Sequence, residues 1–165
     1  MQTFLPYVDN FKLSAQVLDN KRLNKQLLEG RQIYSALLGN TIGWRNHPAT
    51  LMWKNHENML FEYLTAIKDE CERRGIKTEK NWTEIVRMHE SNYNRGSGLM
   101  VPAWMRDEKL ANKIEITHRA NLFLKDPIHY FEFEYAVNKY RNSVCCERCN
   151  YYWFSHKMAE EFQLV

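Results

Sequence analysis

The sequence predicts a mainly α, compact single-domain helical bundle, and three observations support this. Apolar residues recur at three- and four-residue intervals along most of the chain, instead of alternating as in strands. Only 6 glycines and 4 prolines interrupt the 165 residues, so regular elements can be long. The length suits one domain, because domains typically run to about 100–150 residues. We therefore assign residues 1–165 to one domain, with a helical core over 1–134 and a tail over 135–165.

Proline and capping residues set the first elements. Pro6 stops a helix from growing through QTFLPY, which predicts a short extended N-terminal segment. Asp9 is predicted to cap a helix over residues 10–18. Asp19 is predicted to cap a second helix that ends at Gly39.

Further helices follow the same signals. Pro48 is predicted to begin one helix that continues to Gly75, and a shorter helix is predicted over 80–91. The next predicted helix is capped by Asp107 and reaches residue 125. Asp126-Pro127 is predicted to start one more helix, and the tail from residue 141 is predicted to be irregular.

The composition, 44% hydrophobic and 26% charged, is typical of a soluble globular protein. No apolar run approaches the roughly 18–20 residues of a membrane span, so we expect no membrane partner. The N-terminus lacks the basic and apolar regions of a signal peptide, which favours a cytoplasmic location. Signatures of dinucleotide-binding, P-loop, zincin and α/β-hydrolase proteins are missing, and we expect no cofactor.

The positive charge is concentrated at one end of the chain. The net charge is +3, and residues 1–50 carry six Lys/Arg against three Asp/Glu, whereas the remainder is balanced. This predicts a local basic surface that faces an anion. Within it, Lys25 and Glu29 are four residues apart and share a helix face on which Arg22 also lies, and Lys21 is a further candidate contact to DNA or a nucleotide.

This charged helix face has two interpretations. The first is a solvated face with a salt bridge worth roughly 0.3–0.5 kcal/mol. The second is a site in which Lys21, Arg22 and Lys25 hold phosphates while Glu29 moves a proton or stabilises a cationic transition state. The nearby cations would favour the ionised carboxylate, and hence the electrostatic role.

The turn GWRNHPATLMW, residues 43–53, brings together aromatic, cationic and amide groups before a helix. Trp44 is able to stack on a base, and Arg45, Asn46 and His47 suit an anion at a helix N-terminus. The alternatives are a hydrophobic staple for Trp44 and a helix cap for His47. We expect this turn to form one wall of a cleft and the early helix with Glu29 to form the other.

A second polar group occurs late in the chain. His118, Arg119 and Asn121 lie in THRANLFLKDPIHY, and Trp104 follows a rigid proline turn upstream. We consider all four as DNA or nucleotide contacts. The alternative for the cations is interaction with the helix dipole.

Cysteines in VCCERC suggest a metal site. Cys146 and Cys149 have CxxC spacing, and a tetrahedral zinc site would also need Cys145 and His156 or a distant histidine. Because a second pair at proper spacing is missing, unmetallated reduced thiols are the alternative.

Several stretches together resemble a known family. QTFLPY, VLDNKRLNKQ, GWRNHPATLMW, PAWMRDE and HRANLFLKDPIHY are similar to an uncharacterised bacterial and phage branch grouped with the pyrimidine-dimer DNA glycosylases, and more remotely to phage endonuclease V. The resemblance covers roughly residues 2–130, and the tail from about residue 135 diverges from it.

The resemblance implies a compact helical enzyme that flips a base out of DNA, cleaves an N-glycosidic bond and has AP-lyase activity through an N-terminal amine. Glu29 is the nearest match to the family's assisting glutamate. Gln2 is a departure: its large side chain predicts that Met1 is retained, so the attacking amine would be that of Met1. Two other nucleophiles could take the place of this amine: a water molecule positioned by Glu29, or the side-chain amine of Lys25 with a lowered pKa.

The leading hypothesis is therefore a DNA N-glycosylase with DNA as its partner. A non-enzymatic binder of a nucleotide or nucleotide-like signal is the second hypothesis, and it uses the same aromatic and cationic groups. A zinc-stabilised nucleic-acid-binding module is the third.

Overall fold

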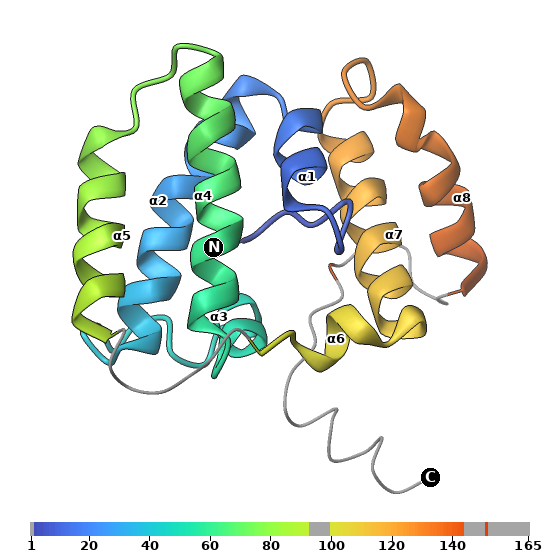
Figure 1. The fold of residues 1–165 in the computed structure, drawn as a ribbon. Coiled ribbons are helices and arrows are strands. Elements are labelled where there is room, and N and C mark those ends of the chain that lie inside the picture. The colour runs from blue at the N-terminus through green and yellow to red at the C-terminus, as the bar shows by residue number, and fades with distance from the viewer. Residues whose placement is uncertain (1, 93–99, 144–150, 152–165) are drawn as a thin grey trace, which may run out of the picture.

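The computed structural model describes residues 2–92, 100–143 and 151, and every regular element in these ranges is helical, which confirms the predicted fold class (Figure 1). In chain order the helices are α1 (Phe11–Val17), α2 (Asn20–Leu37), α3 (Pro48–Trp53), α4 (Glu57–Arg73), α5 (Glu79–Asn92), α6 (Ala103–Arg106), α7 (Glu108–Lys125), the short 3-10 helix η2 (Phe131–Phe133) and α8 (Glu134–Ser143). None of the described helices is both long and apolar enough to span a bilayer.

The helices form two groups around the N-terminal segment. In Figure 1, α2 lies with α4 and α5 on one side, and α7 with α8 on the other. Helix α1 packs against α4, while the short helices α3 and α6 lie at one end of the bundle. The main hydrophobic core, which includes Trp53, Tyr63 and Trp104, links α2 and α4 to α7. A second, smaller cluster packs α8 against α7.

Two predictions for helices in the first half of the chain were wrong. Asn10, not Asp9, caps α1, because its side-chain oxygen accepts a hydrogen bond from the Leu13 amide. The predicted helix from Pro48 to Gly75 is two helices, α3 and α4. The break contains Asn55 at φ 66°, a left-handed conformation that asparagine tolerates better than most residues.

Differences also occur near the C-terminal end of the described chain. No α-helix starts at Asp126-Pro127; a turn and η2 come first, and α8 begins only at Glu134. The Asp126 side chain instead accepts a hydrogen bond from the His129 amide and closes that turn. Helix α8 continues to Ser143, slightly beyond the predicted limit of regular structure.

The extended N-terminal segment lies at the centre of the bundle, where side chains take the place of a neighbouring strand. The Phe4 amide donates to Oε1 of Gln26 at 3.0 Å, and the Phe4 carbonyl accepts from the Tyr63 hydroxyl at 3.1 Å. The Leu5 amide donates to Nδ1 of His118 at 2.8 Å. Buried backbone groups need such partners, so helices α2, α4 and α7 together fix this segment.

The start of α2 is held by a charged hydrogen-bonded group. The Asp19 side chain caps the helix at the Arg22 amide and also accepts from the Arg22 guanidinium and, at 2.6 Å, from the Tyr130 hydroxyl. Burial alone would raise the pKa of the Asp19 carboxyl. The hydrogen bonds from Tyr130 and Arg22 outweigh burial and lower it.

This lowered pKa predicts a pH-dependent stability. A carboxyl whose pKa is depressed on folding stabilises the protein above its unfolded-state pKa, and this contribution is lost as the pH falls from about 5 toward 2. In Asp19→Asn the helix cap is retained but the charge is removed, so the free energy of unfolding should fall less steeply over this range. Urea unfolding at several pH values measures both slopes. Equal slopes for the two proteins would contradict the assignment.

Candidate functional site

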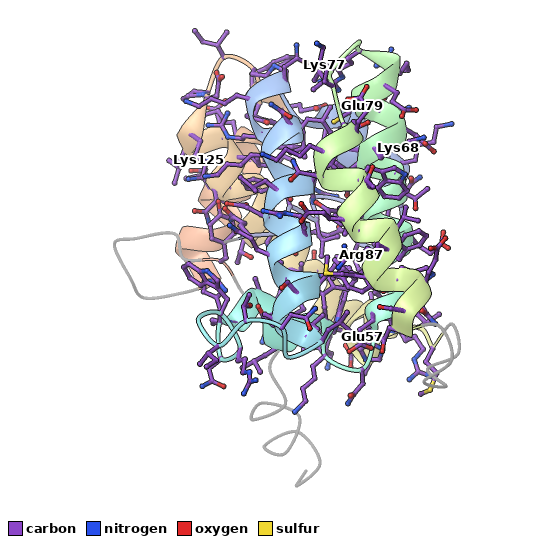
Figure 2. The ribbon with its side chains drawn as sticks, turned by 90° about the vertical axis from the view of Figure 1, so that its left-hand side faces the viewer. Glu57, Lys68, Lys77, Glu79, Arg87 and Lys125 are labelled. Atoms are coloured by element: carbon purple, nitrogen blue, oxygen red, sulfur yellow. The ribbon has the colours of Figure 1, made fainter. Side chains whose placement is uncertain are left out.

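A pocket with a volume of about 270 Å³ lies along the first half of α2. Two side chains come from the N-terminal segment, one from the end of α7 and four from α2: Gln2, Phe4, Lys125, Lys21, Arg22, Lys25 and Glu29. Figure 2 shows Lys125 beside α2, on the side opposite α5. Four cations and one carboxylate therefore surround a hollow that is suited to an anion.

Glu29 is the acidic group of this pocket. Its side chain is 10% exposed, and its Oε1 lies 3.4 Å from Nζ of Lys25, whose side chain is 64% exposed. The predicted i,i+4 stripe is therefore present, with the carboxylate inside and the ammonium group at the surface. A carboxylate shielded from water in this way acts more strongly on a charge that develops beside it than an exposed one would.

The N-terminal segment supplies the floor of the pocket. Because the backbone of Phe4 is fixed from both sides, Phe4 and Gln2 are placed beside α2. Tyr151, from the predicted tail, packs edge-on against Phe4 and His118 with ring centroids 6.0 and 5.2 Å apart. Burial raises the pKa of Tyr151 to about 12, although a hydrogen bond with Gln2 acts in the opposite direction.

The turn with Trp44, Arg45, Asn46 and His47 does not line this pocket. Trp44, Arg45 and Asn46 are exposed, and His47 caps α3 by accepting a hydrogen bond from the Ala49 amide at 3.1 Å. Burial lowers the pKa of His47, and the negative charge of Glu29 partly opposes this shift. The turn and the pocket therefore do not form the two walls of one hollow, and the expectation of a shared cleft was wrong.

The later polar residues lie inside the fold. His118 is buried and holds the Leu5 amide, and Arg119 donates to the Pro6 carbonyl at 2.7 Å and to Glu115 at 3.0 Å. Asn121 is also buried and donates to a carbonyl within α7. The structure therefore gives each of these side chains a partner within the protein. Their role in binding DNA or a nucleotide stays a prediction.

Trp104 is in the core and not on a surface turn. It is 1% exposed, and its indole Nε1 donates to the Met52 carbonyl at 3.1 Å. Its ring also packs perpendicular to Trp53. A base has no access to this face in the described structure, which leaves Trp44 as the exposed member of the predicted tryptophan pair.

Some predicted site residues lie outside the described part of the chain. These are Met1, Cys145, Cys146, Cys149 and His156. Among the described residues, no group of three or more His, Cys, Asp or Glu side chains is placed to hold a metal ion. The zinc hypothesis for the tail is thus not addressed.

The sequence analysis missed four residues that lie at or beside the pocket. Phe4 was considered only as part of an extended segment, Gln2 only for that segment and for retention of Met1, and Lys125 only as a helix end. Tyr151 lies in the tail, where a cluster of aromatic residues was the available signal. All four are brought to the pocket by contacts between segments far apart in the sequence.

Comparison with known families adds one finding. A family model described as pyrimidine dimer DNA glycosylase matches residues 1–84, which is half of the chain. This range contains every residue that lines the pocket except Lys125. The comparisons with curated proteins and with solved structures returned no match.

Proposed function

The chain belongs to the pyrimidine dimer DNA glycosylase family, and from this premise we propose that it is a DNA N-glycosylase acting on pyrimidine dimers in duplex DNA. The observation that supports this most directly is the shielded Glu29 carboxylate among the four pocket cations. The cations suit the phosphates of DNA, and the carboxylate suits a sugar that develops positive charge.

The cations have the binding role in this proposal. Lys21, Arg22, Lys25 and Lys125 contact the phosphates on either side of the damaged nucleotide. These contacts position the strand but carry no sequence information. Extrusion of a nucleotide costs a few kcal/mol and least at a distorted step, so a pyrimidine dimer is a favourable target.

Glu29 has the chemical role. The bond between C1′ of the sugar and the base nitrogen breaks, and its electron pair leaves with the base, which takes up a proton. The carboxylate of Glu29 stabilises the positive charge that develops on the sugar. A nucleophile then attacks C1′: water yields an abasic site, whereas an amine yields a Schiff base that leads to strand cleavage by β-elimination.

Two amines are candidate nucleophiles. Met1, which carries the α-amine, directly precedes Gln2 in the chain, and Gln2 lines the pocket. Lys25 lies at the pocket as well, but its side chain is largely exposed and paired with Glu29. A lysine nucleophile generally depends on desolvation, so the exposure of the Lys25 side chain argues against it, and we propose the α-amine as the nucleophile.

The test is formation of abasic sites in a duplex oligonucleotide with a single thymine dimer. We expect alkali-labile sites at the dimer and none in the undamaged duplex of the same sequence. The same assay on oligonucleotides with other damaged or modified bases tests whether the enzyme excises bases other than pyrimidine dimers. Absence of both abasic sites and strand breaks in all of these duplexes would refute the proposed activity.

Borohydride identifies the nucleophile in the same reaction. If an amine attacks, reduction of the Schiff base should give a covalent adduct of protein and DNA. The peptide carrying the DNA then distinguishes Met1 from Lys25. Abasic sites without an adduct would show a monofunctional glycosylase that uses water.

A further inference from the structure

The turn after α2 exposes large apolar side chains in a positively charged setting. Residues 41–46 are all exposed, and Ile42 and Trp44, the apolar tip of the turn, are 83% and 45% exposed. From Gly39 to His56 the sequence contains no Asp or Glu, whereas Arg45 and Lys54 add positive charge. Exposed apolar groups in a stretch whose charged residues are cations suit a polyanion with an apolar interior, as in duplex DNA.

The backbone of this turn is held in place at both ends. Gly39 adopts φ 79°, a conformation that favours glycine, and its carbonyl accepts from the Arg45 guanidinium at 3.5 Å. The His47 amide donates to the Trp44 carbonyl at 3.1 Å, and the two rings pack edge to face. The apolar tip is therefore presented on an ordered support.

The tip also lies within reach of the pocket along a DNA strand. Gly39, where the turn begins, comes ten positions after Glu29, which corresponds to about 15 Å at a rise of about 1.5 Å per residue. A DNA strand advances about 3.4 Å per nucleotide, so this distance spans about four nucleotides. Figure 2 shows the turn at the lower end of α2, below Lys125.

We propose that the apolar tip of the turn is a wedge that enters the DNA base stack within about four nucleotides of the nucleotide held at the pocket. Ile42 and Trp44 would partly unstack one base step and kink the duplex, as inserted apolar side chains do in other DNA-binding proteins. The kink helps to extrude the damaged nucleotide toward Glu29. This proposal rests on the proposed function for the identity of its DNA partner.

Fluorescence of 2-aminopurine tests the wedge, because this base analogue brightens when it is unstacked. It is placed in turn at each position within four nucleotides of a thymine dimer, on both strands. All proteins carry Glu29→Gln, so that the substrate stays intact, and are used at saturating concentration. We expect protein binding to raise the fluorescence several-fold at one or two adjacent positions. In the double variant Ile42→Ser, Trp44→Ala this rise in fluorescence should be roughly ten-fold smaller.

Ile128→Ser is the matched control. Ile128 is 90% exposed and is flanked in sequence by Asp126 and Glu132. The segment between α7 and η2 that contains it lies at the end of the bundle opposite the turn after α2 (Figure 1). The control should keep the full fluorescence rise. The wedge is refuted if no position brightens, if the double variant matches the parent, or if Ile128→Ser loses the signal equally.

The abasic-site assay, on proteins that retain Glu29, separates the two proposals. A tip-dependent fluorescence rise without abasic sites supports the wedge and refutes the glycosylase. Abasic sites formed at the same rate with and without Ile42 and Trp44 support the glycosylase and refute the wedge. Sedimentation of the protein alone provides a further check, since a dimer that dissociates after substitution of the tip would identify this surface as a contact between copies and overturn the wedge.

Discussion

Glu29→Gln is expected to lower the rate of abasic-site formation by a factor of about 10²–10⁴, the range typical for loss of a positioned catalytic group. Glutamine keeps the shape of the side chain but has no negative charge to offer the sugar. DNA affinity should stay the same or increase, because the negative charge of Glu29 would no longer oppose the four pocket cations. Single-turnover kinetics and a binding titration on the dimer-containing duplex measure the two effects separately.

Glu84→Gln is a suitable control for this prediction. Glu84 is also a helical glutamate that pairs with a cation of α2, in this case Arg31, but it does not line the pocket. We expect its substitution to leave turnover within about two-fold, because an exposed ion pair contributes at most about 1 kcal/mol to stability. Wild-type turnover in Glu29→Gln would exclude the catalytic role that we give this residue.

Gly30→Val should have the largest effect on stability among the predictions made here. A Cβ atom at Gly30 would lie 2.2 Å from Cδ2 of Leu64, which is fully buried in α4. Because Leu64 is fully buried, either its side chain must repack against its core neighbours or α2 and α4 must move apart. Overpacking of this kind costs about 1–3 kcal/mol, and the melting temperature should fall by roughly 2–4 °C for each kcal/mol.

Gly43→Val provides the comparison, because a Cβ atom at Gly43 meets nothing within 4 Å and the residue has no positive φ. Its stability should stay close to that of the wild type. Since Gly30 follows Glu29 directly, a shift of α2 also moves the carboxylate, and activity should fall more than stability alone explains. Equal melting temperatures for the two variants would show that α2 and α4 do not pack as described.

The sequence by itself determined the features that depend on residues close together in the chain. Asp19, Pro48 and Asp107 mark helix starts correctly, since a cap or a fixed φ acts within one turn. The pairing of Lys25 with Glu29 was also predictable, because residues four apart share a helix face.

Only the tertiary structure decided which other groups join Glu29. The pocket needs Phe4 and Lys125, which lie more than a hundred residues apart in sequence, and helical periodicity carries no information about such pairs. The same limit explains His118: a histidine beside an arginine suggests a ligand site, but its partner is the amide of Leu5, 113 residues away. Burying an extended segment forces distant polar side chains to satisfy its backbone, and packing alone selects them.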